Sequence, residues 1–83
     1  MYLEVITPDK RVFEGEIETV ILPGAKGAFQ VLKHHAPIVS ALGKGKLIIR
    51  TSESEEELVY EVEGGVAEVL NDRLSVLVEA LKS

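Results

Sequence analysis

The sequence contains no cysteine, and this absence excludes several kinds of chemistry at once. Disulfide bonds, thiolate nucleophiles and zinc sites with thiolate ligands all need cysteine, and none of the 83 residues is one. A chain without cysteine is typical of a reducing compartment. Any catalytic or metal site would have to be built without thiols.

Long hydrophobic runs and basic residues are also scarce. No apolar run approaches the roughly 20 residues of a membrane-spanning helix, and the start of the chain lacks the pattern of a signal peptide. We therefore expect a soluble chain that meets a membrane only indirectly, through a partner. The net charge is −5, with 14 acidic residues against 9 lysines and arginines, and there is no basic stripe with interleaved aromatics. Nucleic acid and anionic lipid are therefore not expected as partners.

The length of the chain allows one domain with a modest core. For 83 residues, surface scaling predicts that folding buries roughly 63% of the surface of the unfolded chain. No internal repeat or linker divides the sequence. We expect a single β-sandwich domain over residues 1–83.

What the sequence has in abundance is short apolar runs that alternate with polar residues. Val, Ile and Leu recur at every second position, in runs separated by glycine, proline or acidic turns. This pattern is typical of half-buried β-strands, and no stretch keeps a 3.6-residue period over three turns. The sequence predicts an all-β fold, an antiparallel β-sandwich or flattened barrel of about eight to ten short strands.

The first half of this pattern predicts two strands in detail. One strand is expected to end at the turn formed by residues 8–10, where proline presets φ. A second, longer strand is expected over residues 11–22, with Val20 on the same solvent-exposed face as three glutamates. Gly15 is expected to let this strand bend or bulge.

The second half holds three segments with particular expectations. Residues 38–42 suit a short strand or one helical turn, and the neighbouring strands favour a strand. Residues 52–57 contain four carboxylates, whose repulsion predicts an exposed hairpin tip. Gly64 and Gly65 are expected to break the chain into separate strands on either side.

The residues that could support catalysis or metal binding follow no established motif. His34 and His35 are adjacent, so on an extended chain their side chains point to opposite sides and make a poor metal pair. No serine lies in a nucleophile-elbow pattern. The phosphate-loop pattern is absent, since Lys26 and Lys44 are each followed by glycine. We expect no catalytic residues, no cofactor and no metal site.

One stretch departs from the strand pattern and is the candidate binding surface. Residues 23–40 hold two of the three prolines, two of the seven glycines and both histidines. Binding groups are often placed on loops that a rigid sheet supports. Composition and periodicity therefore predict a small β domain for binding or assembly.

The residues of this stretch resemble the signature of the epsilon subunit of F-type ATP synthases. The matching positions are Pro23, Gly24, Gly27, Phe29, Val31, Leu32, His35, Ala36, Pro37 and Ile38. The likeness continues in residues 3–17, 42–45, 64–65, 68–69 and 76–80, so it covers nearly the whole chain. Departures are Gln30, Lys33 and His34, where relatives commonly have Gly, Pro and Gly, and Ala28, where an acidic residue is common.

The resemblance implies the N-terminal β-sandwich domain of a rotor subunit. It implies a non-catalytic central-stalk part of a proton-translocating F-type ATP synthase that couples the gamma subunit to the c-ring. The implied location is the cytoplasmic face of the bacterial plasma membrane. Relatives continue into two helices that inhibit ATP hydrolysis and in some members bind ATP. The present sequence ends at Ser83, and we expect neither property by that route.

The contacts implied with gamma and the c-ring fall in the same stretch. Loop and polar positions on the matched motif are the expected partner residues, namely Pro23, Gly24, Lys26, Gly27, Ala28, His34, His35, Ala36, Pro37 and Ser40. Phe29, Val31 and Ile38 are expected to be core residues rather than anchors for a partner.

A biotinyl or lipoyl carrier domain is the alternative from another class. Such domains are also small, acidic and all-β, with a modified lysine on a hairpin tip, and Lys10, Lys26 and Lys44 lie at expected turns. The usual M-K-M or D-K-A setting of that lysine is absent. This absence favours the rotor subunit.

Overall fold

The computed structural model describes residues 1–51 and 57–82, which form eight β-strands and no helix. The strands are β1 (Tyr2–Ile6), β2 (Arg11–Glu16), β3 (Thr19–Gly24), β4 (Gly27–Leu32), β5 (Ile38–Leu42), β6 (Gly45–Arg50), β7 (Glu57–Leu70) and β8 (Arg73–Lys82). The predicted all-β fold is therefore confirmed. The described residues contain no helix long and apolar enough to cross a membrane.

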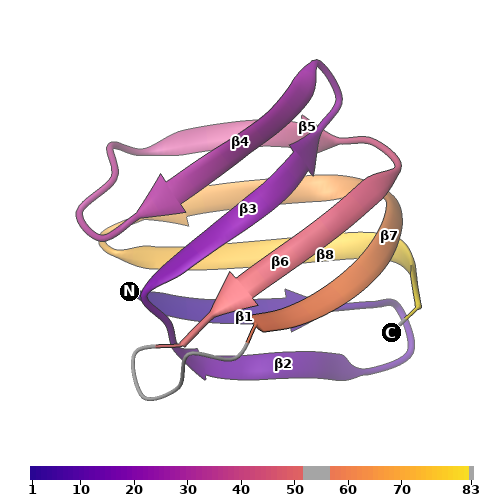
Figure 1. Cartoon of the computed structure of the whole chain (residues 1–83), viewed down its shortest axis with the longest axis horizontal. Helices are drawn as coiled ribbons and strands as arrows, with labels where there is room; N and C mark the ends of the chain where they lie inside the picture. Colours follow the sequence, from indigo (N-terminus) through magenta and orange to yellow (C-terminus); the bar gives the residue numbers. More distant parts are fainter. Residues whose placement is uncertain (52–56, 83) are drawn as a thin grey trace.

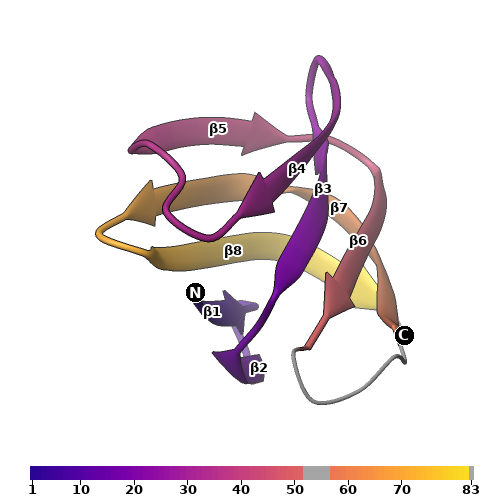
Figure 2. The ribbon, with the colours of Figure 1, turned by 60° about the vertical axis from the view of Figure 1, so that its left-hand side comes forward.

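The strands form two layers that share β7 (Figure 1). In one layer β2, β1, β8, the second half of β7 and β5 lie side by side, and in the other β4, β3, β6 and the first half of β7 do so. Figure 2 shows β3 crossing in front of β8 at a steep angle. Paired strands are antiparallel except β1 and β8, which are parallel. The structure thus confirms the predicted sandwich and adds one parallel pair.

The core lies between the layers and is filled by alternate apolar side chains. The buried residues are Met1, Leu3, Val5, Ile17, Val20, Leu22, Val31, Leu42, Leu47, Ile49, Val62, Ala67, Val69, Leu74, Val76 and Val78. Val31 is fully buried, and Phe29 and Ile38 are half-buried against this cluster. The prediction that these three belong to the core is confirmed.

The predicted long strand over residues 11–22 is wrong, because the chain changes layer in its middle. Ile17 donates its N–H to the Met1 carbonyl, and Glu18 donates to the Arg50 carbonyl, both at 2.8 Å. This break shifts the alternation by one residue, so Val20 is buried and not on the glutamate face. The irregularity in the β1–β2 ladder lies between Val5 and Ile6 rather than at Gly15.

The second half of the chain confirms one expectation and corrects another. Residues 38–42 form the strand β5, as predicted. The predicted break at Gly64 and Gly65 is wrong, since β7 runs through both glycines. Their φ angles of 63° and 137° let the strand bend from one layer to the other while its pairing with β8 continues. Of the predicted hairpin tip, Glu57 begins β7 and residues 52–56 lie outside the described residues.

Candidate functional site

The β3–β4 hairpin carries the first group of predicted partner residues. Gly24 pairs with Gly27, so Ala25 and Lys26 alone form the turn. Lys26, Gly27 and the neighbouring Ala28 are exposed, whereas Pro23 is buried. The hairpin therefore offers its tip to a partner, and Pro23 supports it from within.

Backbone hydrogen bonds hold the turn end of this hairpin against the end of β5. Ala25 donates its N–H to the Ala41 carbonyl at 2.9 Å, and Gly43 donates to the Pro23 carbonyl at 2.8 Å. A Cβ atom on Gly24 would lie 2.6 Å from the Gly27 carbonyl oxygen. Because glycine alone fits there without a shift, the sequence keeps the two strands of the hairpin tightly paired.

The connection between β4 and β5 carries the second group, at the other end of β4 (Figure 1). His34 and the residues at 36–37 are exposed, and His35 is half-buried. The ring Nδ1 of His35 lies 2.7 Å from the Ala36 carbonyl oxygen. Ser40 lies on β5, where its hydroxyl donates to the Ala41 carbonyl at 3.3 Å. The structure thus divides the predicted surface into a hairpin tip and a histidine loop, and does not bring them into one cluster.

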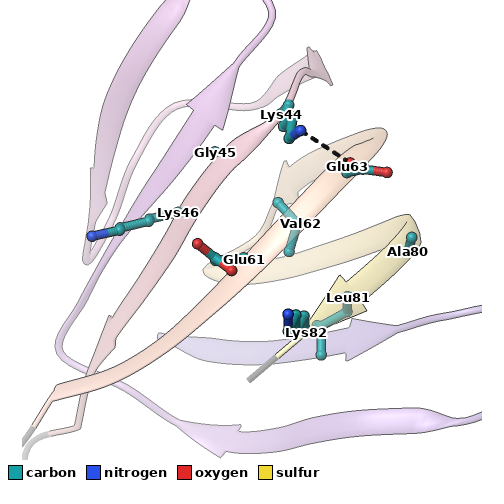
Figure 3. A pocket seen from close by; sticks show the side chains of 9 residues that line it. All are labelled: Lys44, Gly45, Lys46, Glu61, Val62, Glu63, Ala80, Leu81 and Lys82. Atoms are coloured by element: carbon teal, nitrogen blue, oxygen red, sulfur yellow. Dashed lines mark ion pairs between the residues drawn. The ribbon is translucent and has the colours of Figure 1, made fainter.

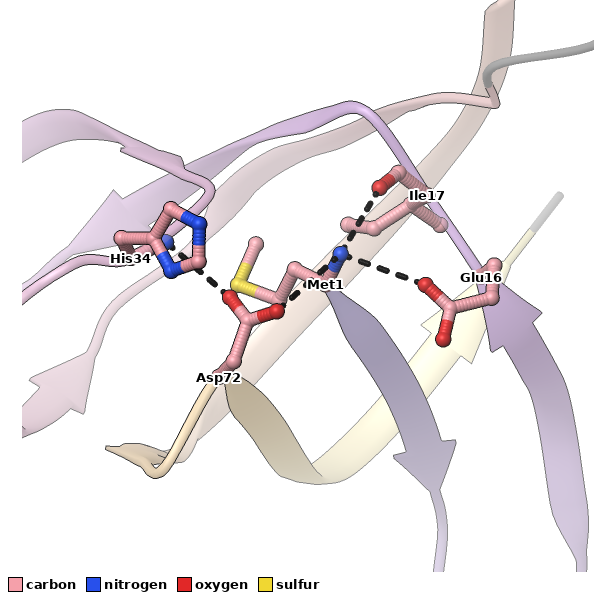
Figure 4. A network of polar contacts seen from close by, with 5 residues as sticks. All are labelled: Met1, Glu16, Ile17, His34 and Asp72. Atoms are coloured by element: carbon pink, nitrogen blue, oxygen red, sulfur yellow. Dashed lines mark hydrogen bonds and ion pairs between the residues drawn. The ribbon is translucent and has the colours of Figure 1, made fainter.

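Asp72, in the turn between β7 and β8, fixes the histidine loop (Figure 4). Its Oδ1 accepts the backbone N–H of His34 at 3.0 Å, and its Oδ2 lies 3.7 Å from the Met1 ammonium. That ammonium also lies 3.2 Å from Glu16 Oε2 and 3.4 Å from the Ile17 carbonyl oxygen. Three parts of the chain, namely its first residue, the histidine loop and the turn between β7 and β8, therefore meet at Asp72.

The hydrogen bond from the His34 backbone also lowers the pKa of Asp72. The His34 N–H holds the pKa of Asp72 below its ordinary value of 3.8, against an opposing effect of desolvation, and the Met1 ammonium lowers it further. His34 has a φ of 63° and Asp72 a φ of 58°, a region that Asn, Asp and His occupy more readily than most residues. Local backbone geometry and charge thus favour the same contact.

Replacing Asp72 by asparagine is expected to make stability less dependent on pH in acid. Asparagine tolerates the same φ but carries no charge. Because folding lowers the pKa of Asp72, its carboxylate stabilises the fold above pH 3.8 and loses this contribution as the pH falls through the folded pKa. The parent should therefore be the more stable at pH 7, and the difference should shrink below pH 3.8. Denaturant unfolding of parent and variant across this pH range measures the difference in their unfolding free energies. A difference that stays constant with pH would contradict the prediction.

A shallow pocket of about 600 Å³ lies over β6, β7 and β8 (Figure 3). Its walls carry charges of both signs, including Lys46, Glu61 and Lys82, and Lys44 Nζ lies 3.5 Å from Glu63 Oε1. These charged side chains are exposed. Within residues 1–51 and 57–82, no three His, Asp or Glu side chains are grouped to hold a metal ion.

The whole chain matches a known domain family. The family described as ATP synthase, Delta/Epsilon chain, beta-sandwich domain matches residues 1–83. The chain is 43% identical over 77 residues to the ATP synthase epsilon chain of Chlorobaculum tepidum, covering 93% of this chain and 86% of that protein. It is 44% identical over 78 residues to the chloroplastic epsilon chain of Cyanidioschyzon merolae, covering 94% of this chain and 58% of the relative. It thus spans most of one relative and little more than half of the other.

Solved structures share the fold. A chain of the Euglena gracilis mitochondrial ATP synthase OSCP/F1/c-ring gives a TM-score of 0.88 at 20% identity, over 95% of this chain and 50% of that one. A chain of the Tetrahymena thermophila mitochondrial ATP synthase central stalk and c-ring gives 0.80 at 21% identity, over 96% and 63%. At these identities the likeness concerns the β-sandwich alone.

Proposed function

Because this chain belongs to the family of ATP synthase delta/epsilon chain β-sandwich domains, we propose that it is a non-catalytic central-stalk subunit of a proton-translocating F-type ATP synthase. It couples the gamma subunit to the c-ring and turns with them at the cytoplasmic face of the bacterial plasma membrane. The observation that carries this proposal is the likeness to epsilon chains across more than nine-tenths of the chain. The role asks for contact surfaces and not for catalytic groups of its own.

The packing of the sandwich suits such a role. Its core is apolar throughout, with no buried polar or charged residue among those described. Close-packed interiors deform little and transmit strain. A strand shared by both layers, β7, adds a covalent connection between them. A compact body of this kind passes a torque from one contact surface to another.

The biotinyl or lipoyl carrier is not supported by the comparisons. The match over residues 1–83 is to an ATP synthase domain, and the relatives compared above are epsilon chains. Lys26 does lie in a hairpin turn, which is the position a carrier lysine would need, but no comparison connects it with such a modification.

The contact surface of the proposed subunit has two separate regions. The hairpin tip and the histidine loop stand at opposite ends of the six-residue strand β4, about 20 Å apart at the rise of an extended chain. A partner that touches both must itself be extended, or two partners must share them. We propose that gamma and the c-ring divide these regions between them.

Recovery of the complex from cells tests the proposed role. A tagged form of this chain, made in a cell that contains its own synthase, should bring down gamma, and with mild detergent the c-ring as well. Recovery of the chain alone at physiological salt would contradict the proposal. An unrelated β-sandwich protein with the same tag serves as the control, and it should recover neither subunit.

Substitutions in each region test the proposed surface. Ala28→Trp at the hairpin and His34→Asp in the loop change exposed positions, and aspartate tolerates the φ of 63° at position 34 as histidine does, so the fold should persist. Each should lower the recovered partner at least about fivefold, because a bulky or newly charged group at a packed interface costs roughly 1–3 kcal/mol. Lys10→Glu, an exposed change in the β1–β2 turn, should leave recovery within twofold. Equal recovery for all three variants would rule out this surface.

A further inference from the structure

The two strands with only one described neighbour differ in how their free edges are protected. β2 pairs only with β1, and β4 only with β3. The edge of β2 carries Arg11, Glu14 and Glu16, and Arg11 makes ion pairs of 3.0 Å with Glu4 and 3.3 Å with Glu14. Charges of this kind normally prevent an edge from accepting another strand. β4 reads GAFQVL and contains no charge and no proline, so its edge has no such protection.

The pairing of β4 shows which of its backbone groups face outward. The Pro23 carbonyl accepts a hydrogen bond from Gly43, so the backbone of Pro23 points away from its cross-strand partner, Ala28. The Pro23–Ala28 pair is therefore a non-hydrogen-bonded pair, and hydrogen bonding alternates along the strand. The N–H and C=O groups of Ala28, Gln30 and Leu32 consequently point to the free edge. The side chains of these three residues are also exposed, and that of Leu32 is 50% exposed.

Both ends of this edge carry a positive charge. Lys26 immediately precedes β4 and Lys33 immediately follows it, and both are exposed. Among residues 1–51 and 57–82, neither lysine has an ion-pair partner. The two flank six residues of unprotected edge in a chain whose net charge is −5. The positive ends are thus a local feature and not part of a generally basic surface.

From these features we infer that the free edge of β4 accepts one additional antiparallel strand, an extended segment of another protein with a carboxylate at each end. The segment bonds to the outward backbone groups of Ala28, Gln30 and Leu32, and its terminal carboxylates pair with Lys33 and Lys26. A span of about eight residues fits, at roughly 3.4 Å per residue. The inference rests on the proposed function only in taking the donor to be another subunit of the complex.

The same charges favour a strand with acidic ends over a second copy of this chain as the occupant. Two antiparallel copies that bond through their outward groups would pair Gln30 with Gln30 and Ala28 with Leu32. Such a pair leaves Lys26 and Lys33 of both copies without a carboxylate at the ends of the strands. A strand with acidic ends supplies one carboxylate to each lysine of this chain.

A peptide titration tests the inference on the isolated 83-residue chain. The probe is acetyl-Glu-Thr-Val-Thr-Val-Thr-Val-Glu-amide, and the control has lysine in place of both glutamates. In NMR spectra of the labelled chain, the glutamate peptide should shift the amides of Ala28, Gln30 and Leu32 and slow their hydrogen exchange. The lysine peptide should bind about tenfold more weakly, because two cross-strand attractions become repulsions. In the double variant Lys26→Glu with Lys33→Glu this preference should reverse.

Backbone-directed changes separate strand addition from simple charge attraction. Gln30→Pro removes an outward N–H without touching the bonds to β3, which is how edge strands tolerate proline. It should weaken binding at least about tenfold, whereas Gln30→Thr should bind within twofold of the parent. N-methylation of the central threonine of the peptide, which faces β4, should abolish binding, and N-methylation of the next valine should not.

The possible outcomes either support or overturn the proposed addition of a strand to β4. Failure of the glutamate peptide to bind, equal binding of both peptides, or unimpaired binding to Gln30→Pro would overturn the inference. A concentration-dependent dimer that the peptide dissociates would instead identify a second copy as the occupant. Because no other subunit is present, failure here leaves recovery of gamma and the c-ring unaffected, and failure of that recovery leaves this result standing.

Discussion

Replacing Gly65 by alanine is expected to lower the free energy of unfolding by about 4 kcal/mol, since backbone strain and a steric clash act together. Gly65 has a φ of 137°, which side chains other than hydrogen rarely allow. An added Cβ would collide with the Leu77 carbonyl oxygen and lie 2.9 Å from the Val78 Cα. Both obstacles are backbone atoms of β8, so neither moves without disturbing the sheet.

Gly27 provides a matched control for this substitution. Its φ of 134° is nearly the same, but an added Cβ would meet nothing within 4 Å. Gly27→Ala should therefore cost only the backbone strain, about 1–2 kcal/mol. Denaturant unfolding followed by far-ultraviolet circular dichroism measures both variants. Equal losses for Gly65→Ala and Gly27→Ala would mean that contact with β8 contributes nothing to the bend in β7.

The second large effect is expected from Leu74 in β8, where truncation to alanine should cost about 3 kcal/mol. Leu74 is 0% exposed, and removing buried methyl groups loses their transfer free energy and leaves a cavity. Small domains of this size have roughly 4–12 kcal/mol in total. The variant should therefore keep its fold at 25 °C but unfold at a much lower denaturant concentration.

Leu77, three residues along the same strand, is the control for Leu74. It is 49% exposed, so Leu77→Ala removes the same atoms from a half-solvated position and should cost less than about 1 kcal/mol. Both variants should keep the same dependence of unfolding free energy on denaturant. If Leu77→Ala were as harmful as Leu74→Ala, the division of β8 into a core face and an outer face would be wrong.

Alternation in the sequence predicts strands where the chain stays in one layer. Leu74 and Val76 follow the rule, because the two sides of β8 meet different surroundings along its length. The rule fails between Ile17 and Val20, where the chain crosses from one layer to the other and burial shifts by one residue. Such a crossing depends on contacts with Met1 and Arg50, which are remote in sequence. Periodicity, a local property, therefore cannot reveal it.

The candidate surface shows the same division between local and remote information. Glycine and proline placed the hairpin and the loop in the sequence, because glycine permits positive φ and proline fixes its own φ. The hairpin and the loop lie apart because the extended strand β4 stands between them. The contact of Asp72 with His34 joins residues 38 positions apart, and no local pattern signals it. The remaining predicted partner residues await the recovery experiments.

The parallel pairing of β1 with β8 joins two strands that lie about 70 residues apart in the sequence. β8 lies between β1 and β7 in its layer, so the hairpin of β1 and β2 has no second neighbour until residues 73–82 exist. Pairings between such distant parts of a chain form slowly. A nascent chain must therefore carry the open edge of β1 until β8 is made, and this layer cannot be completed before then.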